Sequence, residues 1–154
     1  ASVISYLQST AATSIAPNTF NQVSMTEVNV STNGIGHSGS AGYVTILETG
    51  IYDISIKAGF QNQNTLGSRG IWLYVGSSDW TTAGKPTGSA GWNVLASVGS
   101  ASGTGTKSNH FSYVSASTTL SLPSGTVVTP LVGHSADANI SIASVDFIIR
   151  LVGY

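Results

Sequence analysis

Residues 43–60 constrain the fold more than any other stretch, because two β-patterned runs meet there at Gly50. In the second run, apolar and polar side chains alternate strictly from Tyr52 onward, which is the pattern of a strand with one buried face. The apolar face holds Tyr52, Ile54, Ile56, Ala58 and Phe60, and the polar face holds Asp53, Ser55 and Lys57. We therefore expect antiparallel β-sheet with one side in a core.

The rest of the chain predicts an all-β antiparallel sandwich of jelly-roll type. Helical periodicity is nearly absent, and short β-branched or aromatic runs recur between clusters of Gly, Ser, Asn and Pro. The expected strands are 2–7, 20–30, 43–48, 51–60, 69–76, 92–98, 109–115, 118–122, 126–133 and 139–152. The 154 residues fit one domain. We expect the jelly roll at 20–154, preceded by a strand and extended segment, 1–19, that could dock on a partner.

Two of the expected strands carry apolar side chains on both faces. In 69–76, Ile71, Leu73 and Val75 alternate with Trp72 and Tyr74, so both faces need a cover. In 139–152, one face is core and the other is mixed. The core face holds Val145, Phe147, Ile149 and Leu151, and the mixed face holds Asp146, Ile148, Arg150, Val152 and Tyr154.

The mixed face predicts a contact with another subunit. Asp146 and Arg150 lie about 13 Å apart along an extended strand and cannot pair with each other, so we expect their partners on a second copy. A change of apolar phase, from Ile142 to Val145, predicts a β-bulge near Ala143–Ser144.

Several short motifs, in order, resemble the C1q/TNF-like superfamily of homotrimeric jelly rolls, from about residue 20 to the end. They are Tyr43–Ile54 with its Gly50-x-Tyr52 element, Ile71–Gly76, Leu120–Val128 with its Gly125 turn, and Val145–Leu151. Thr126 stands where the family usually has Asp, and Gly76 is not preceded by Asn. The resemblance implies a trimer packed around a threefold axis, with the last strand near it. The expected interface residues are Trp72, Tyr74, Asp146, Ile148, Arg150, Val152 and Tyr154.

Composition excludes several classes of partner and chemistry. Charged residues make up 7% of the chain, the net charge is −1, and the five basic residues are scattered, which argues against nucleic acid. Cysteine is absent, so disulfides and thiolate metal sites are excluded. The apolar runs are too short to span a membrane, and no signal-peptide pattern opens the sequence.

No motif predicts catalysis, a metal or another cofactor. The segment 133–137, with His134, Ser135 and Asp137, lacks the spacing of a nucleophile elbow. The histidines, His37, His110 and His134, share no metal-binding spacing. Two alternatives stay open: three copies of one histidine around a threefold axis, and calcium near Asp79 or Asp137–Asn139.

The ligand-binding candidates lie in and after the loop 77–91. Exposed indoles at Trp80 and Trp92 would offer flat faces to a sugar ring or a partner, with Asp79 and Asn93 as polar neighbours. The alternative is that both indoles pack down and hold the loop.

We therefore expect a non-enzymatic homotrimeric module of a virus particle, located at the virion surface. A bacteriophage capsid decoration (cement) protein or a fibre head fits best, with capsid or other virion proteins as partners. The alternative is a carbohydrate-binding lectin or receptor-binding tip that recognises a cell-surface glycan through the Trp-bearing loops. A secreted C1q/TNF-type ligand is a third interpretation.

Overall fold

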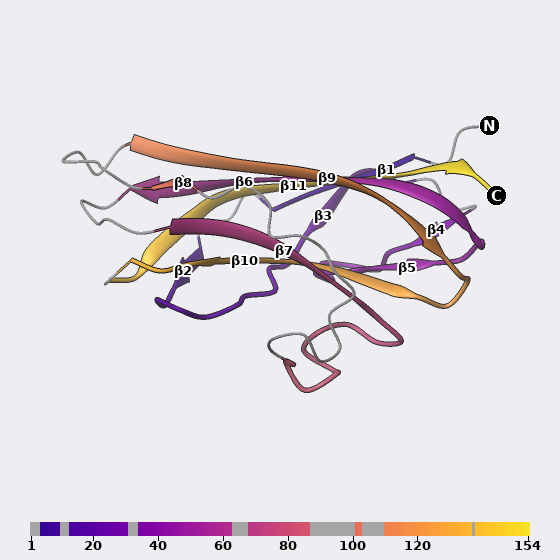
Figure 1. The fold of residues 1–154 in the computed structure, drawn as a ribbon, viewed down its shortest axis with the longest axis horizontal. Coiled ribbons are helices and arrows are strands. Elements are labelled where there is room, and N and C mark those ends of the chain that lie inside the picture. Colours follow the sequence, from indigo (N-terminus) through magenta and orange to yellow (C-terminus); the bar gives the residue numbers. More distant parts are fainter. Residues whose placement is uncertain are drawn as a thin grey trace.

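The protein, seen in a computed structural model, is a sandwich of two antiparallel β-sheets (Figure 1). The structure describes residues 4–9, 13–30, 34–62, 68–86, 101–102, 110–136 and 138–154. The six-stranded sheet contains β1 (Ile4–Ser9), β2 (Thr13–Ile15), β3 (Thr26–Val30), β6 (Gly50–Asn62), β9 (His110–Leu122) and β11 (Ile140–Gly153). The five-stranded sheet contains β4 (Ile35–Gly36), β5 (Val44–Ile46), β7 (Ser68–Gly76), β8 (Ala101–Ser102) and β10 (Val127–His134).

Strand order places β11 inside the six-stranded sheet. That sheet runs β3-β1-β11-β6-β9, with β2 also paired to β11, and the other runs β4-β5-β10-β7-β8. No helix in the described part of the chain has the length and hydropathy of a membrane span.

The core lies between the sheets and follows the predicted alternation. All five side chains on the apolar face of β6 are buried, as are those of Val145, Phe147 and Ile149 on β11, which confirms both predicted core faces. Ile71, Leu73 and Val75 of β7 join the same core from the other sheet. The bulge is also confirmed, because the register of β11 against β6 shifts between Ile142 and Ser144.

The predicted strand boundaries need three corrections. The separate strands expected at 109–115 and 118–122 are one strand, since Ala116 and Ser117 stay in register with Ile56 and Ser55 of β6. In 20–30 only 26–30 is strand, and Asn21 makes an isolated bridge to Val132. The short strands β2, β4 and β8 were not expected, because segments of two or three residues carry no periodic signal. The strand expected at 92–98 lies outside the described residues.

The N-terminal residues that the structure describes belong to the sandwich. β1 lies between β3 and β11, and β2 pairs with the start of β11. The segment 1–19 thus contributes strands to the sheet that the jelly roll at 20–154 completes, and its docking on a partner stays a prediction. Residues 4–9 supply an inner strand of the six-stranded sheet, and residues 13–15 form the short strand paired with the start of β11.

Candidate binding surface

The outer face of the five-stranded sheet is covered by the chain itself. Tyr74 and Trp80 are 6% and 4% exposed and form a second apolar cluster with Leu131, against which Phe20 and Trp72 pack. The rings of Phe20 and Trp72 meet edge to face at 4.9 Å. In Figure 1 the segment after β7 lies beyond this sheet, on the side away from the core.

Trp72 and Tyr74 therefore pack against side chains of their own subunit, and their expected place in a trimer interface stays a prediction. The prediction that both faces of β7 are covered holds. The sequence could not show which rings provide this cover. They belong to Phe20, far before β7 in the sequence, and to Trp80, shortly after it.

The loop after β7 is fixed by hydrogen bonds to the N-terminal segment. Gln22 donates to the Asp79 carboxylate at 3.1 Å, and its amide oxygen accepts from the Thr81 amide at 3.1 Å and hydroxyl at 2.9 Å. Burial alone would raise the pKa of Asp79, but hydrogen bonds from Thr82 and Gln22 outweigh it and lower that pKa.

Trp80 consequently offers no open indole face for a sugar. Its indole N–H donates to the Pro86 carbonyl at 2.8 Å, and its amide donates to the Thr129 hydroxyl at 3.3 Å. This is the packed-down arrangement that the alternative interpretation described. Asp79 lies beside Trp80 and is held by Gln22, whereas Trp92 and Asn93 lie outside the described residues.

The outer face of the six-stranded sheet, in contrast, is open and partly apolar. Ile148 is 39% exposed and Val152 is 47% exposed, both on β11 and pointing away from the core. The register places Ile4 beside Arg150, Ile51 near the end of β11, and Tyr113 beside Gly59. These side chains are exposed too, as is Tyr154 beyond the last strand. We name this set, Ile4, Ile51, Tyr113, Ile148, Val152 and Tyr154, the open apolar face.

Asp146 and Arg150, whose partners we expected on another copy, have partners within their own subunit. Asp146 accepts hydrogen bonds from the Tyr6 hydroxyl at 2.7 Å and from Gln8 Nε2 at 2.9 Å. Arg150 lies 3.1 Å from the Asp53 carboxylate. The sequence separation of 97 between Asp53 and Arg150 hid this pair, although both lie on facing strands.

These contacts shift two acid–base equilibria. The hydrogen bond to Asp146, burial and the nearby negative charge raise the pKa of Tyr6. The Thr119 hydroxyl and then the Arg150 guanidinium lower the pKa of Asp53. The carboxylate of Asp53 is thereby stabilised in its ionised form.

A hollow of about 460 Å³ lies between these groups on the open side of the sheet. It is lined by Asp53, Ser55, Ser117, Thr118, Thr119, Ile148 and Arg150. The lining is one ion pair, several hydroxyls and an apolar floor residue. Such a surface suits contact with a partner that supplies both apolar and hydrogen-bonding groups.

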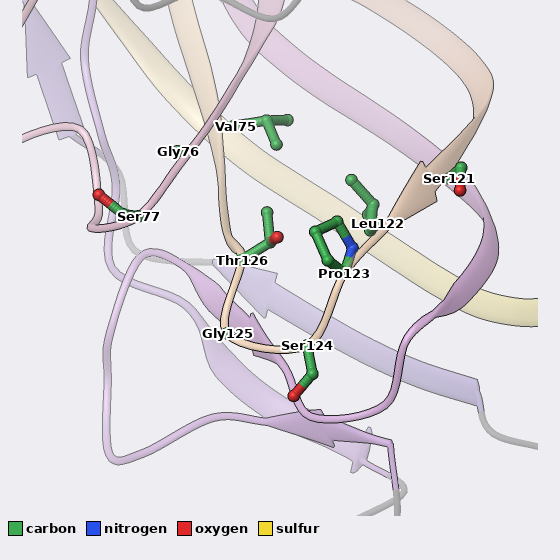
Figure 2. A pocket seen from close by; sticks show the side chains of 9 residues that line it. All are labelled: Val75, Gly76, Ser77, Ser121, Leu122, Pro123, Ser124, Gly125 and Thr126. Atoms are coloured by element: carbon green, nitrogen blue, oxygen red, sulfur yellow. The ribbon is translucent and has the colours of Figure 1, made fainter.

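A second hollow, of about 420 Å³, opens at one end of the sandwich between β7, β9 and the turn that follows β9. In Figure 2, Val75, Leu122, Pro123 and Thr126 point toward one another, whereas Ser121 and Ser124 point away. Its lining contains no charged residue. The hollow therefore offers hydroxyl and backbone groups but no carboxylate, imidazole or amine.

The described residues form no group of three or more His, Cys, Asp or Glu that could hold a metal ion. His134 is buried, with Nε2 2.9 Å from the Ile15 carbonyl and Nδ1 accepting from the Ala136 amide at 3.2 Å. Both nitrogens are thus used to fix β2 and the end of β10. Asp137 lies outside the described residues.

Known structures share this architecture, while no protein-family profile and no curated protein sequence matches the chain. Murine APRIL superposes with a TM-score of 0.63 at 15% identity, covering 98% of this chain and 100% of that one. The fold is a C1q/TNF-like jelly roll. Eiger TNF from S. frugiperda gives 0.64 at 12% identity, covering 99% of this chain and 94% of its own. The globular domain of zebrafish complement 1qA gives 0.59 at 14%, covering 97% of each. At these identities the likeness concerns the jelly-roll fold.

Proposed function

We propose that this chain is a non-enzymatic binding module that assembles as a homotrimer through the open apolar face. The observation that carries the proposal is the exposure of Ile148, Val152 and their neighbours on one sheet, while the chain itself covers the apolar side chains on the other. Complete burial of a fully exposed apolar side chain of this size contributes about 1.5–3 kcal/mol, and covering the exposed parts of Ile148 and Val152 contributes a share of that. The resemblance to a superfamily of homotrimers supports a second copy of this chain as the partner.

The polar groups on that face are compatible with burial. Covering a charge is costly when it has no partner, and much less so when it is already paired and hydrogen-bonded. Asp53 is held by Thr119 and Arg150, and Asp146 by Tyr6 and Gln8. A neighbouring subunit could therefore cover these carboxylates without leaving one of them unpaired.

The test is the mass of the purified protein in solution by light scattering. A trimer of three 15.7 kDa subunits is expected. A monomer over the whole accessible concentration range would contradict the assembly and leave the open apolar face to a different partner.

Within this role, we propose a place on a virus particle, as a bacteriophage capsid decoration protein or a fibre head. The support is the low charge of 7%, the absence of cysteine and a surface rich in hydroxyl and amide groups, together with the trimer-type fold. A decoration role predicts stoichiometric binding to capsids that lack the protein, at threefold or quasi-threefold sites. Failure of the purified trimer to bind such capsids would remove this role but not the trimer.

The carbohydrate-binding alternative gains no support from Trp80, because the indole is buried. Its other candidate residues are Asp79, Trp92 and Asn93. A glycan array on the intact protein tests it, and Trp92→Ala should abolish any signal that this loop produces.

A further inference from the structure

His37 is a buried histidine with one nitrogen that has no hydrogen-bond partner. It follows β4, and its side chain is 0% exposed. Nε2 lies 2.8 Å from the Ala41 carbonyl. Nδ1 is buried without a hydrogen-bond partner and faces the Glu27 carboxylate at 3.8 Å. Glu27 belongs to β3, the edge strand of the other sheet.

The two contacts fix which nitrogen carries the proton in the neutral ring. A carbonyl oxygen only accepts hydrogen bonds, so Nε2 must donate to Ala41. Nδ1 of neutral His37 then carries a lone pair and can only accept a hydrogen bond. It faces a carboxylate oxygen, which is also only an acceptor when ionised. Neither group can satisfy the other in this state.

Protonation of the ring reverses this situation. Nδ1–H could then donate to Glu27, and the two groups would carry opposite charges. We propose that His37 and Glu27 form a proton-operated latch, which closes when His37 is protonated and ties β3 to the loop 37–42. The latch joins the edge of the six-stranded sheet to the β4–β5 connection of the five-stranded sheet.

Besides Glu27, the one ionisable side chain on the described elements around His37 is the phenol of Tyr43, between the loop 38–42 and β5. The loop 38–42 and the segment 22–25 carry none, and they meet through the Met25 amide and the Ser40 carbonyl. β4 and its partner β5 carry none either. Glu27 is therefore the group that decides how protonation of His37 affects this part of the fold.

The latch matters because β3 is held weakly by packing. Four of its five residues are exposed, and its strand pairing is with β1 alone among the described strands, across an irregular register. An added charge-assisted hydrogen bond at Glu27 would secure this edge. Because the latch needs a proton on Nδ1 of His37, it adds stability only when the ring is protonated, so its contribution is present at acidic pH and absent when the ring is neutral.

The test compares the wild-type protein with Glu27→Gln by thermal unfolding at pH 7.5 and pH 5.0, at one protein concentration. The amide that this substitution introduces can donate an N–H to the neutral Nδ1 of His37, so at pH 7.5 the variant should equal or exceed the wild type. At pH 5.0 the closed latch should stabilise the wild type. The unfolding midpoint of the wild type relative to that of the variant should therefore rise by about 3 °C between pH 7.5 and pH 5.0. Because Glu27 is 45% exposed, the variant is expected to fold.

Other titrating groups, His134 included, are common to both proteins and cancel in this difference. A difference in midpoint that is the same at both pH values would overturn the latch. Nitrogen-15 spectra of the histidine rings give a second readout. In the wild type we expect the neutral ring of His37 to carry its proton on Nε2. On acidification, a signal of protonated Nδ1 should appear. A proton on Nδ1 at pH 7.5 would contradict the assignment.

Discussion

The outer faces of the two sheets differ in whether the chain itself covers their apolar side chains. On the five-stranded sheet, Tyr74 and Leu131 are closed over by Trp80 and the N-terminal segment. On the six-stranded sheet, Ile148 and Val152 stay open to solvent. Both sheets have apolar side chains on both sides, so this pattern alone shows that a cover is needed and leaves open whether the same chain provides it.

The difference follows from local turn structure. After β7 the chain turns back through residues 77–86, with Gly84 and Lys85 in the left-handed region at φ of 91° and 56°. This turn brings Trp80 over the sheet. β11, in contrast, continues as strand to Gly153, and Ile148 stays 39% exposed among the described residues.

The largest expected effect is on the covered face. Trp80→Ala should destabilise the fold by about 3–5 kcal/mol, because it empties a buried site and removes the ring that seals the cluster. Leu47→Ala, at a 48% exposed position outside the open apolar face, is the control and should lose much less stability. Denaturant unfolding measures both. Equal small losses would mean that the loop does not cover the sheet in solution.

On the open face, Ile148→Lys should leave the subunit folded and weaken assembly by at least about tenfold in the dissociation constant, since it places a charge in the centre of the proposed interface. Ala83→Lys adds the same charge to an exposed position in the loop after β7 and serves as control. Sedimentation and circular dichroism separate the two effects. A trimer as stable as the wild type would move the interface away from β11.

Periodicity was sufficient to predict a β-sandwich and its core faces, and the resemblance added the C1q/TNF-like fold, but neither predicted the covers. The alternation in 51–60 and around Phe147 places the core correctly, because the two faces of a strand are set by the alternation of its own residues. The pairs that define the surfaces join residues far apart: Gln22 and Asp79 are 57 apart in sequence, and Asp53 and Arg150 are 97 apart. No local sequence pattern reveals contacts between residues so far apart in the chain. The sequence therefore could not distinguish a buried Trp80 from an exposed one.

A smaller effect is expected where the cover is fastened. Gln22→Ala removes three hydrogen bonds to Asp79 and Thr81 and should cost about 1–2 kcal/mol, since these groups are partly open to water and can rebond. Ser24→Ala, an exposed position in the same segment, is the control. Denaturant unfolding should show the loss for Gln22→Ala only. No loss would mean that apolar packing alone holds the loop.

The smallest effect concerns Asp53 on the open face. Thr119 and Arg150 lower its pKa, so the stability that it contributes is present above the ordinary aspartate value of about 3.9 and is lost as pH falls through the lowered value. Asp53→Asn should therefore lower the unfolding midpoint slightly at about pH 6, and the wild-type and variant curves should converge toward about pH 2.

Salt dependence turns this small effect into a test of the open face. In a monomer the pair of Asp53 and Arg150 is exposed, and salt should screen it. In a trimer that covers the hollow, the same substitution should have a larger effect that resists salt. Unfolding of both proteins at low and high salt thus reports whether a second copy covers this face, and an equal, fully screened effect at every protein concentration would argue that none does.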